Sequence, residues 1–382
     1  MTNKIAIKPK KTVANKFSLA EEYLNERYKI RFNIISLDIE IRVIDSKEWK
    51  ILNENSLFIE LQKEGINISI NNLIALLKSD YVPEHDPFKE YFKGLPKWDG
   101  FDYIGYLASF VKAKDQEAFN NHFRKWLVRL VKTAIDDKFF NKQALIFVHD
   151  EQNSGKSTFC RFLCPPLLNN HIVENVKDDK DSRIALATNI IVNLDELASL
   201  PRNEINGLKS LFSILFVSDR LPFGKKRITI PRRCSFIGST NENEFLHDET
   251  GSVRWLCFEI DKIDWNYKIE VDINMVYSQA YHLVKSDYNF NLTADEISEN
   301  EIRNKSFQQL SEESQLVHKY FMPDESQKAE NFKTATDVKV RLSIHTGNNR
   351  YSVSKIGKAL KQLGAIKKKQ SGIYGYYLIE KI

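Results

Sequence analysis

The pattern of apolar and polar residues predicts a parallel β-sheet in the middle of the chain. Three short runs rich in β-branched and aromatic residues occupy residues 146–148, 188–194 and 234–240. Runs this short and this apolar are typical of strands that are buried on both faces of a sheet. Polar residues follow each run, and a helix-like segment comes soon after the first. We therefore predict an α/β fold with polar side chains at the C-terminal ends of its central strands.

The N-terminal part has a mixed pattern, which predicts a small α/β or helical module. Residues 19–28 have helical spacing, residues 33–43 resemble a strand, and helical stretches surround Ile59 and Ile74. A largely helical region follows over residues 102–138.

The C-terminal part has the pattern of a winged helix-turn-helix. Residues 334–342 read as a capped helix, and residues 352–363 read as a second helix with one apolar face that ends at Gly364. Two strand-like stretches follow at residues 365–369 and 374–379. Two helices followed by a basic two-stranded wing match a DNA-binding module, although the same fold also serves as a protein docking module.

Length and charge predict a globular protein of several domains. The chain has 382 residues, of which 28% are charged, and its net charge is only +5. The charge is uneven, because residues 333–382 hold eleven Lys and Arg residues and only two acidic residues. The predicted segments are an N-terminal mixed α/β module (1–82), a helical segment (83–140), an α/β core (141–265), a helical connector (266–325) and a winged-helix module (326–382).

The sequence predicts a cytoplasmic location. Residues 1–16 are polar and basic without the apolar core of a signal peptide, and no run approaches the length of a membrane span. Cys160, Cys164, Cys234 and Cys257 form no paired CxxC units, so we expect small buried side chains in a reducing compartment rather than disulfides or a zinc site.

Residues 153–158 have the composition of a phosphate-binding loop. They follow a predicted strand and precede a predicted helix, which is the context that such a loop requires. Backbone N–H groups around Gly155 would surround the phosphates, Lys156 would reach the β and γ phosphates, and Ser157 would bind Mg²⁺. The motif also occurs by chance. The predicted cofactor-binding residues are Asn153, Ser154, Gly155, Lys156, Ser157 and Thr158.

The second and third apolar runs end in residues that suit phosphoryl transfer. Asp195 would orient hydrated Mg²⁺ together with Ser157, and Glu196 would polarise the attacking water. Asn241 could hold that water or sense the γ-phosphate. The alternative for the two carboxylates is an ordinary strand with a solvated acidic end.

Two basic segments near the third run suggest further contacts. Arg254 could complete a nucleotide site as an arginine finger, or it could be a surface arginine. Residues 221–233 read as a basic hairpin with Lys225, Lys226 and Arg227 near its tip. Such residues would bind DNA phosphates without reading bases, unless they form a solvated charged turn.

Six motifs in this order resemble the virulence-associated protein E family. They are Trp98-Asp99-Gly100, the loop at 155–158, Asp195-Glu196, residues 218–226, Ser239 to Asn241, and residues 250–254. The family is similar to the superfamily 3 helicases and poxvirus-type primase-helicases of viruses, plasmids and integrated elements, and the resemblance covers about residues 83–262. It implies an α/β P-loop NTPase of the AAA+ (superfamily 3 helicase-like) type, with an N-terminal helical or mixed region and a C-terminal winged helix-turn-helix.

The resemblance also implies cofactors, partners and residue roles. The cofactors are ATP and Mg²⁺, and the partners are DNA and further copies of the chain in a hexameric ring. The catalytic residues are Lys156, Asp195, Glu196, Asn241 and Arg254, with Ser157 and Asp195 as metal ligands. Single-stranded DNA in the ring channel would contact Lys225, Lys226 and Arg227. Duplex DNA would contact Lys355, Lys358, Lys361, Lys367, Lys368 and Lys369 in the C-terminal domain.

Two classes of function remain open at this point. The first is an ATP-dependent DNA helicase or translocase in the replication of a phage, plasmid or integrated element, and the second is a nucleotide-binding replication initiator or assembly factor with little hydrolysis. Glu196 favours the first, because a pure binder has no need of a water-activating carboxylate. A small-molecule kinase would leave the basic tail and hairpin without a purpose. The first 100 residues contain no recognisable primase motif, so priming would come from a separate primase.

Overall fold

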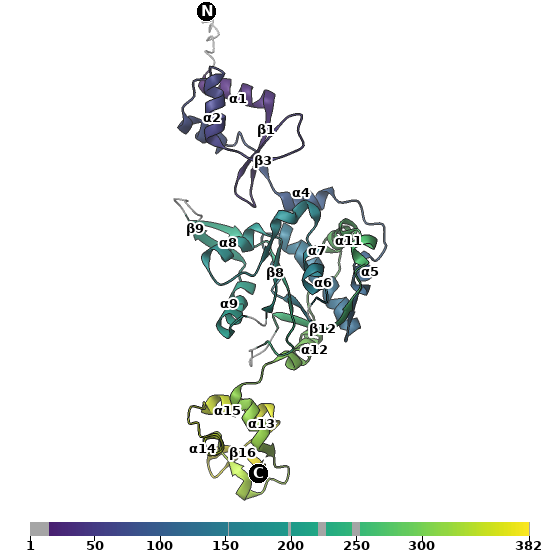
Figure 1. Ribbon diagram of the computed structural model, residues 1–382, viewed down its shortest axis with the longest axis vertical. Coiled ribbons are helices and arrows are strands. Elements are labelled where there is room, and N and C mark those ends of the chain that lie inside the picture. Colours follow the sequence, from purple (N-terminus) through teal and green to yellow (C-terminus); the bar gives the residue numbers. More distant parts are fainter. Residues whose placement is uncertain (1–14, 152, 198–199, 221–226, 247–252, 382) are drawn as a thin grey trace, which may run out of the picture.

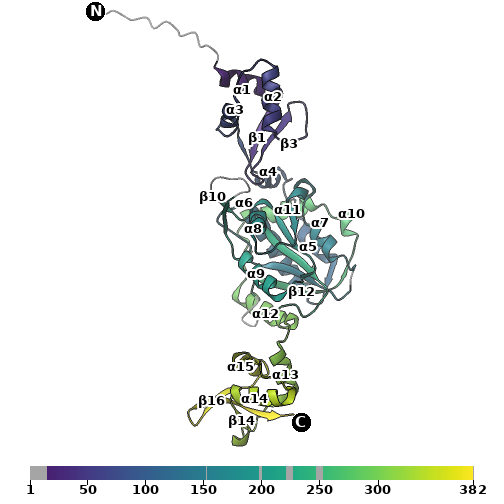
Figure 2. The same cartoon turned by 60° about the vertical axis from the view of Figure 1, so that its left-hand side comes forward.

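The chain forms three bodies that follow one another along one long axis (Figures 1 and 2). The structure is a computed structural model that describes residues 15–151, 153–197, 200–220, 227–246 and 253–381. Separate clusters of buried apolar side chains fill the N-terminal body, the central body and the C-terminal body. The fold is therefore a mixed α/β fold with several sheets.

The central body contains a six-stranded sheet whose spatial order differs from its order along the chain. The strands lie in the order β5-β12-β6-β11-β8-β7, and all neighbours are parallel except β5 and β12. As a result β11 (Ser235–Thr240) lies between β6 (Ala144–Val148) and β8 (Ile191–Leu194). The C-terminal ends of these three strands are neighbours at one edge of the sheet. The remaining strands are β5 (Val111–Ala113), β7 (Ile172–Glu174) and β12 (Trp255–Ile263).

Both faces of the sheet are buried, which explains the continuous apolar runs. In β6, Leu145 and Phe147 enter one apolar cluster, whereas Ala144, Ile146 and Val148 enter the other. Helices α4, α5, α6, α7 and α11 contribute to the first cluster, and α8 and α9 contribute to the second. The helices of the central body are α4 (Pro87–Gly94), α5 (Tyr103–Ser109), α6 (Gln116–Ile135), α7 (Lys156–Phe162), α8 (Lys180–Thr188), α9 (Arg202–Phe212), α10 (Tyr267–Glu270), α11 (Ile273–Lys285) and α12 (Ala294–Asn304).

Several predicted elements of the central body are confirmed. The three apolar runs are strands β6, β8 and β11, and residues 102–138 contain helices α5 and α6. The hairpin before the third run consists of β9 (Phe216–Arg220) and β10 (Arg227–Pro231), which pair antiparallel. The four cysteines are buried, as expected.

The N-terminal body packs three helices on a small sheet of order β3-β2-β1-β4. The prediction of one strand-like stretch over residues 33–43 was wrong, because a turn separates two strands there. The Asn33 side chain accepts hydrogen bonds from the backbone N–H groups of Ile35 (2.9 Å) and Ser36 (3.1 Å), and Leu37 has a φ of 64°. The elements are α1 (Lys16–Arg27), β1 (Tyr28–Asn33), β2 (Ile39–Val43), β3 (Lys50–Ile51), α2 (Glu54–Lys63), α3 (Ile70–Leu77) and β4 (Glu84–His85).

The C-terminal body contains the predicted two helices and two strands in the predicted order. Strand β16 pairs with β13, β14 and β15, and the apolar face of α15 contributes Ile356, Ala359 and Leu360 to the core. Its elements are α13 (Glu312–Tyr320), β13 (Phe321–Pro323), β14 (Phe332–Lys333), α14 (Ala335–Thr346), α15 (Val353–Gln362), β15 (Lys367–Gln370) and β16 (Ile373–Glu380). Among the helices that the structure describes, none is both long enough and apolar enough to cross a bilayer.

A largely buried ion pair joins α12 to α6 in the central body. The Lys125 ammonium donates to both carboxylate oxygens of Glu296 at 2.7 and 2.8 Å and to the carbonyl oxygen of Asn291 at 3.1 Å. Only 8% of the Lys125 side chain and 16% of the Glu296 side chain are exposed. Burial alone would raise the pKa of Glu296, but hydrogen bonds from Lys125, Thr293 and Asn121 outweigh it and lower the pKa to about 2.

We expect Glu296→Gln to destabilise the central body, because it leaves the buried Lys125 charge unpaired. The loss should be about 3 kcal/mol, which corresponds to a fall of roughly 6–12 °C in the melting temperature. Glu299→Gln is the matched control, since Glu299 lies exposed on the same helix. Equal melting temperatures for Glu296→Gln and Glu299→Gln would contradict the role of the pair.

The same pair predicts a pH dependence of stability. The folded state lowers the pKa of Glu296 from 4.5 to about 2, so the stabilisation is complete above about pH 4.5 and is lost as the pH falls toward 2. The difference in melting temperature between the unmodified chain and Glu296→Gln should therefore be constant above about pH 4.5 and shrink as the pH falls from there toward about 2. Calorimetry at a series of pH values measures this difference, and a constant difference would count against the proposed charge state.

Candidate functional site

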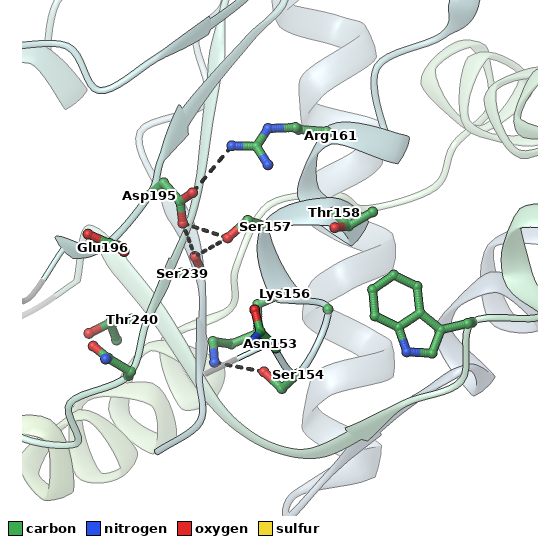
Figure 3. A pocket seen from close by; sticks show the side chains of 13 residues that line it. Asn153, Ser154, Lys156, Ser157, Thr158, Arg161, Asp195, Glu196, Ser239 and Thr240 are labelled. Atoms are coloured by element: carbon green, nitrogen blue, oxygen red, sulfur yellow. Dashed lines mark hydrogen bonds and ion pairs between the residues drawn. The ribbon is translucent and has the colours of Figure 1, made fainter. Parts of the chain in front are cut away.

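A polar cavity of about 500 Å³ lies at the C-terminal ends of β6, β11 and β8 (Figure 3). Side chains from the loop after β6, from α7 and from the segments after β8, β11 and β12 surround it. Its described lining comprises Asn153, Ser154, Gly155, Lys156, Ser157, Thr158, Arg161, Asp195, Glu196, Ser239, Thr240, Asn241 and Trp265. All six predicted cofactor-binding residues thus belong to one cavity.

The loop before α7 depends on left-handed backbone at two positions. Asn153 has a φ of 61° and Gly155 has a φ of 88°, conformations that Asn tolerates and Gly adopts without strain. A Cβ atom on Gly155 would also lie 2.8 Å from the Trp265 ring. The loop therefore needs glycine at position 155 for both its backbone angle and its close packing.

The Lys156 ammonium is held inside the loop by uncharged oxygen atoms. It donates to the carbonyl oxygens of His149 (3.1 Å) and Glu151 (3.0 Å) and to Ser154 Oγ (2.8 Å). Burial lowers the pKa of Lys156, while the nearby charges of Asp150 and Asp195 act in the opposite direction. Since these three acceptors are neutral, the positive charge is suited to pair with an anion in the cavity.

Asp195, which follows β8, is hydrogen-bonded to both α7 and β11. Its Oδ1 atom accepts hydrogen bonds from Ser157 Oγ at 2.6 Å and from Ser239 Oγ at 2.7 Å (Figure 3). Arg161 Nη2 lies 3.3 Å from Asp195 Oδ2, and Arg161 Nε donates to Glu174 at 2.9 Å. Burial raises the pKa of Asp195, but the two hydroxyl groups and the Arg161 charge outweigh it and hold that pKa below its usual value.

Glu196 and Asn241 lie on the same cavity as Asp195. Glu196 directly follows Asp195 and has a φ of 53°, an unusual backbone conformation for a glutamate. Asn241 directly follows β11, which places it between the ends of β6 and β8. Four of the five predicted catalytic residues are therefore brought together.

Arg254 lies at the other end of the sheet. It precedes β12, where Trp255 pairs with Ala144, the first residue of β6, whereas the cavity lies beyond Val148 at the end of β6. Arg254 is exposed and its Nε atom donates to Ser213 Oγ at 3.0 Å. Arg254 therefore does not line the cavity and is the one predicted catalytic residue that lies apart from the other four.

The predicted DNA contacts lie in two places. Lys225 and Lys226 fall outside the described residues, and Arg227 is the exposed first residue of β10. In the C-terminal body Lys358 and Lys361 lie exposed on α15, and Lys367, Lys368 and Lys369 lie exposed on β15. Lys355 is half-exposed and lies 3.6 Å from the buried Glu313 carboxylate of α13, so this carboxylate partly neutralises its charge.

The sequence did not single out Arg161 or Trp265, and Ser239 and Thr240 were named only as part of a motif. Arg161 is one helical turn beyond Ser157, which is the one signal that could have placed it on the cavity side of α7. Ser239 and Thr240 belong to an apolar strand, and Trp265 follows the next strand. Their position depends on the strand order, which the sequence does not reveal.

The donor set around Ser157 and Asp195 fits a magnesium ion. Mg²⁺ prefers one or two carboxylates together with water and substrate phosphates. The Ser157 hydroxyl and the ionised Asp195 carboxylate meet at 2.6 Å and belong to the cavity that also contains Lys156. A nucleoside triphosphate with Mg²⁺ is therefore compatible with the residues present.

The fold and the cavity define a mixed α/β protein with a polar site between the glycine-containing loop that follows β6 and the two carboxylates that follow β8, two strands away. The chain belongs to the virulence-associated protein E-like domain family, whose profile matches residues 92–309. The resemblance seen in the sequence is thereby confirmed, and the match extends beyond residue 262, the end of the range that the resemblance covered.

Solved structures of the NrS-1 C-terminal region have a similar fold. The apo structure of its residues 305–718 has a TM-score of 0.54 and 15% sequence identity, covering 96% of this chain and 99% of that chain. An A-form apo structure of the same region has a TM-score of 0.52 and 15% identity, covering 96% of this chain and 100% of that chain. No curated protein sequence matches the chain significantly. At this identity the similarity concerns the fold.

We expect Gly155→Ala to destabilise the loop. A left-handed φ costs a non-glycine residue about 1–2 kcal/mol, and the added Cβ would also displace Trp265. The melting temperature should fall by at least roughly 2–4 °C. Gly94→Ala is the control, because Gly94 ends α4 and an added Cβ there meets nothing within 4 Å. An unchanged melting temperature for Gly155→Ala would show that the loop tolerates another conformation.

Proposed function

We propose that the chain is an ATP-dependent DNA helicase or translocase of the P-loop AAA+ type, acting in the replication of a phage, plasmid or integrated element. The observation that carries the proposal is the single cavity in which Lys156, Ser157, Asp195, Glu196 and Asn241 meet. Phosphoryl transfer needs phosphate contacts, a metal ligand and a positioned water, and these residues can supply all three. Membership of the virulence-associated protein E-like family supports a role in replication.

The loop residues would bind the phosphates. Lys156 would exchange its neutral acceptors for phosphate oxygens, and the first N–H groups of α7, which lack acceptors within the helix, would point at the same anion. Ser157 and Asp195 would hold Mg²⁺, which neutralises phosphate charge when bound. The low pKa of Asp195 keeps its carboxylate charged and ready to bind a cation at neutral pH.

Glu196 and Asn241 would act on the attacking water. Glu196 would accept the proton from that water, and the Asn241 amide would orient it. Because β11 separates β6 from β8, Asn241 lies between the phosphate loop and the carboxylates. This position suits a residue that contacts both the water and the γ-phosphate.

Rings of identical subunits would complete the site. Arg254 lies far from the cavity of its own chain, so the arginine finger would come from the next subunit of the predicted hexamer. The β9–β10 hairpin would reach single-stranded DNA in the channel. The C-terminal body, with helices α14 and α15 followed by the β15–β16 wing, would bind duplex DNA as a winged helix.

We expect ATP hydrolysis that single-stranded DNA stimulates. Glu196→Gln should lower kcat at least about 100-fold, which is the usual contribution of a general base, while ATP binding persists. Lys156→Ala should abolish binding as well. Glu244→Gln is the matched control, because Glu244 is exposed in the segment after β11 and should leave turnover unchanged.

Two other outcomes would change the proposed function or the proposed catalytic residue. DNA binding without turnover would favour the nucleotide-binding replication initiator instead. Turnover that is retained in Glu196→Gln would mean that another group activates the water. The Asp195-Glu196 pair would then no longer support hydrolysis as the function.

Mixing two inactive variants tests whether Arg254 acts in trans. Arg254→Ala keeps an intact loop and Lys156→Ala keeps an intact arginine, so an equal mixture restores some complete interfaces. About a quarter of the interfaces in a mixed ring should be complete, and turnover should recover to about that fraction. Lack of recovery in mixtures that do form rings would contradict the role of Arg254.

A further inference from the structure

Trp265 forms a wall of the cavity that the phosphate chemistry does not use. Trp265 follows β12, 46% of its surface is exposed, and it lines the cavity together with the loop residues. The six-membered part of its ring lies against Gly155, where an added Cβ would come within 2.8–3.3 Å of three ring atoms. A large aromatic side chain thus remains exposed beside a polar site.

The position of Trp265 is fixed by its neighbours in the chain. The backbone N–H of Asp264 donates to the carbonyl oxygen of Phe110 at 2.8 Å. Tyr267 is fully buried, and its ring meets Phe159 and Phe162 of α7 edge-on, with centroid distances of 5.1 and 4.8 Å. The segment that carries Trp265 is therefore attached to the same helix that begins at the loop.

The strand order places Trp265 and Asp195 on opposite sides of the loop. Asp195 follows β8, which lies two strands from β6 on one side, and Trp265 follows β12, which adjoins β6 on the other side. Three strand spacings of about 4.8 Å separate the two ends, or roughly 14 Å. If the phosphates and metal lie between Lys156 and Asp195, the opposite end of a nucleotide extends toward Trp265.

The indole ring has the chemistry of a stacking surface. The Lys268 ammonium lies over the ring, 4.4 Å from its centroid, and the part of the ring that remains exposed lines the cavity. Aromatic side chains bind nucleobases by stacking, and this contact is tolerant of base identity because every base has a π face.

We propose that Trp265 is the base-binding residue of this site and stacks on the base of a purine nucleotide. The inference rests on the proposed function, since it requires the phosphates to occupy the loop. Purines offer the larger stacking area. Stacking alone does not distinguish adenine from guanine, so Trp265 contributes to affinity for both.

The test compares ligands with and without a base. ADP, GDP and inorganic tripolyphosphate are titrated calorimetrically into the full chain and into Trp265→Ala, Trp265→Phe and Lys156→Ala. Trp265→Ala should weaken ADP and GDP about 5- to 150-fold and leave tripolyphosphate unchanged. Trp265→Phe should retain most of the affinity. Ile269→Ala is the control, because Ile269 is exposed in the same turn and does not line the cavity.

The outcomes separate this inference from the proposed function. Equal weakening of ADP and tripolyphosphate in Trp265→Ala would overturn the inference, because Trp265 would then only support the loop. Unchanged ADP affinity in Trp265→Ala would overturn it too, and if Lys156→Ala still abolished binding the proposed nucleotide site would stand. Absence of binding of all three ligands to the unmodified chain would overturn both.

Discussion

The hydrogen bonds that Asp195 accepts from Ser157 and Ser239 hold the candidate site together. Ser157 lies in the first turn of α7, Ser239 lies in β11, and Asp195 follows β8, so one carboxylate oxygen joins three segments that are distant in the chain. These contacts require β11 to lie between β6 and β8. The strand order is therefore the constraint on which the geometry of the cavity depends, and the ionised state of Asp195 is its electrostatic consequence.

The burial of both faces of the sheet determines where polar chemistry can occur. Leu145 and Phe147 fill one core and Ile146 and Val148 fill the other, which leaves no solvated face along β6. An unpaired polar group within these layers would cost about 1–3 kcal/mol. Polar side chains can gather only where the strands end. In open parallel sheets, ligands bind in the crevice beyond the C-terminal ends of the strands. The apolar runs and the polar cavity thus have the same cause.

The sequence predicted the local structure well and the spatial relations less well. Continuous apolar runs identify β6, β8 and β11 because such strands must be buried on both faces. Asp195 and Asn241 could be named because they follow β8 and β11 directly, and Lys156 because its loop joins β6 to a helix. The stretch at 33–43 was misread because one side chain, Asn33, turns the backbone. Arg161 could have been placed only by its spacing of one helical turn from Ser157, whereas Trp265 could not be assigned, since its place on the cavity depends on strand order and tertiary packing.

The charges of the cavity explain why a second subunit matters to the proposed mechanism. Among its described lining residues the cationic side chains are Lys156 and Arg161, and Arg161 already contacts the carboxylates of Glu174 and Asp195. Lys156, whose acceptors are neutral, has its positive charge available for the phosphates. A transferring phosphoryl group spreads negative charge over several oxygens, which one lysine and a metal ion neutralise incompletely. A further cation must come from outside this cavity, and Arg254, exposed at the far end of β12, is placed to provide it only to a neighbour. On the proposed function, hydrolysis is therefore coupled to assembly, because a single chain does not contain the complete site.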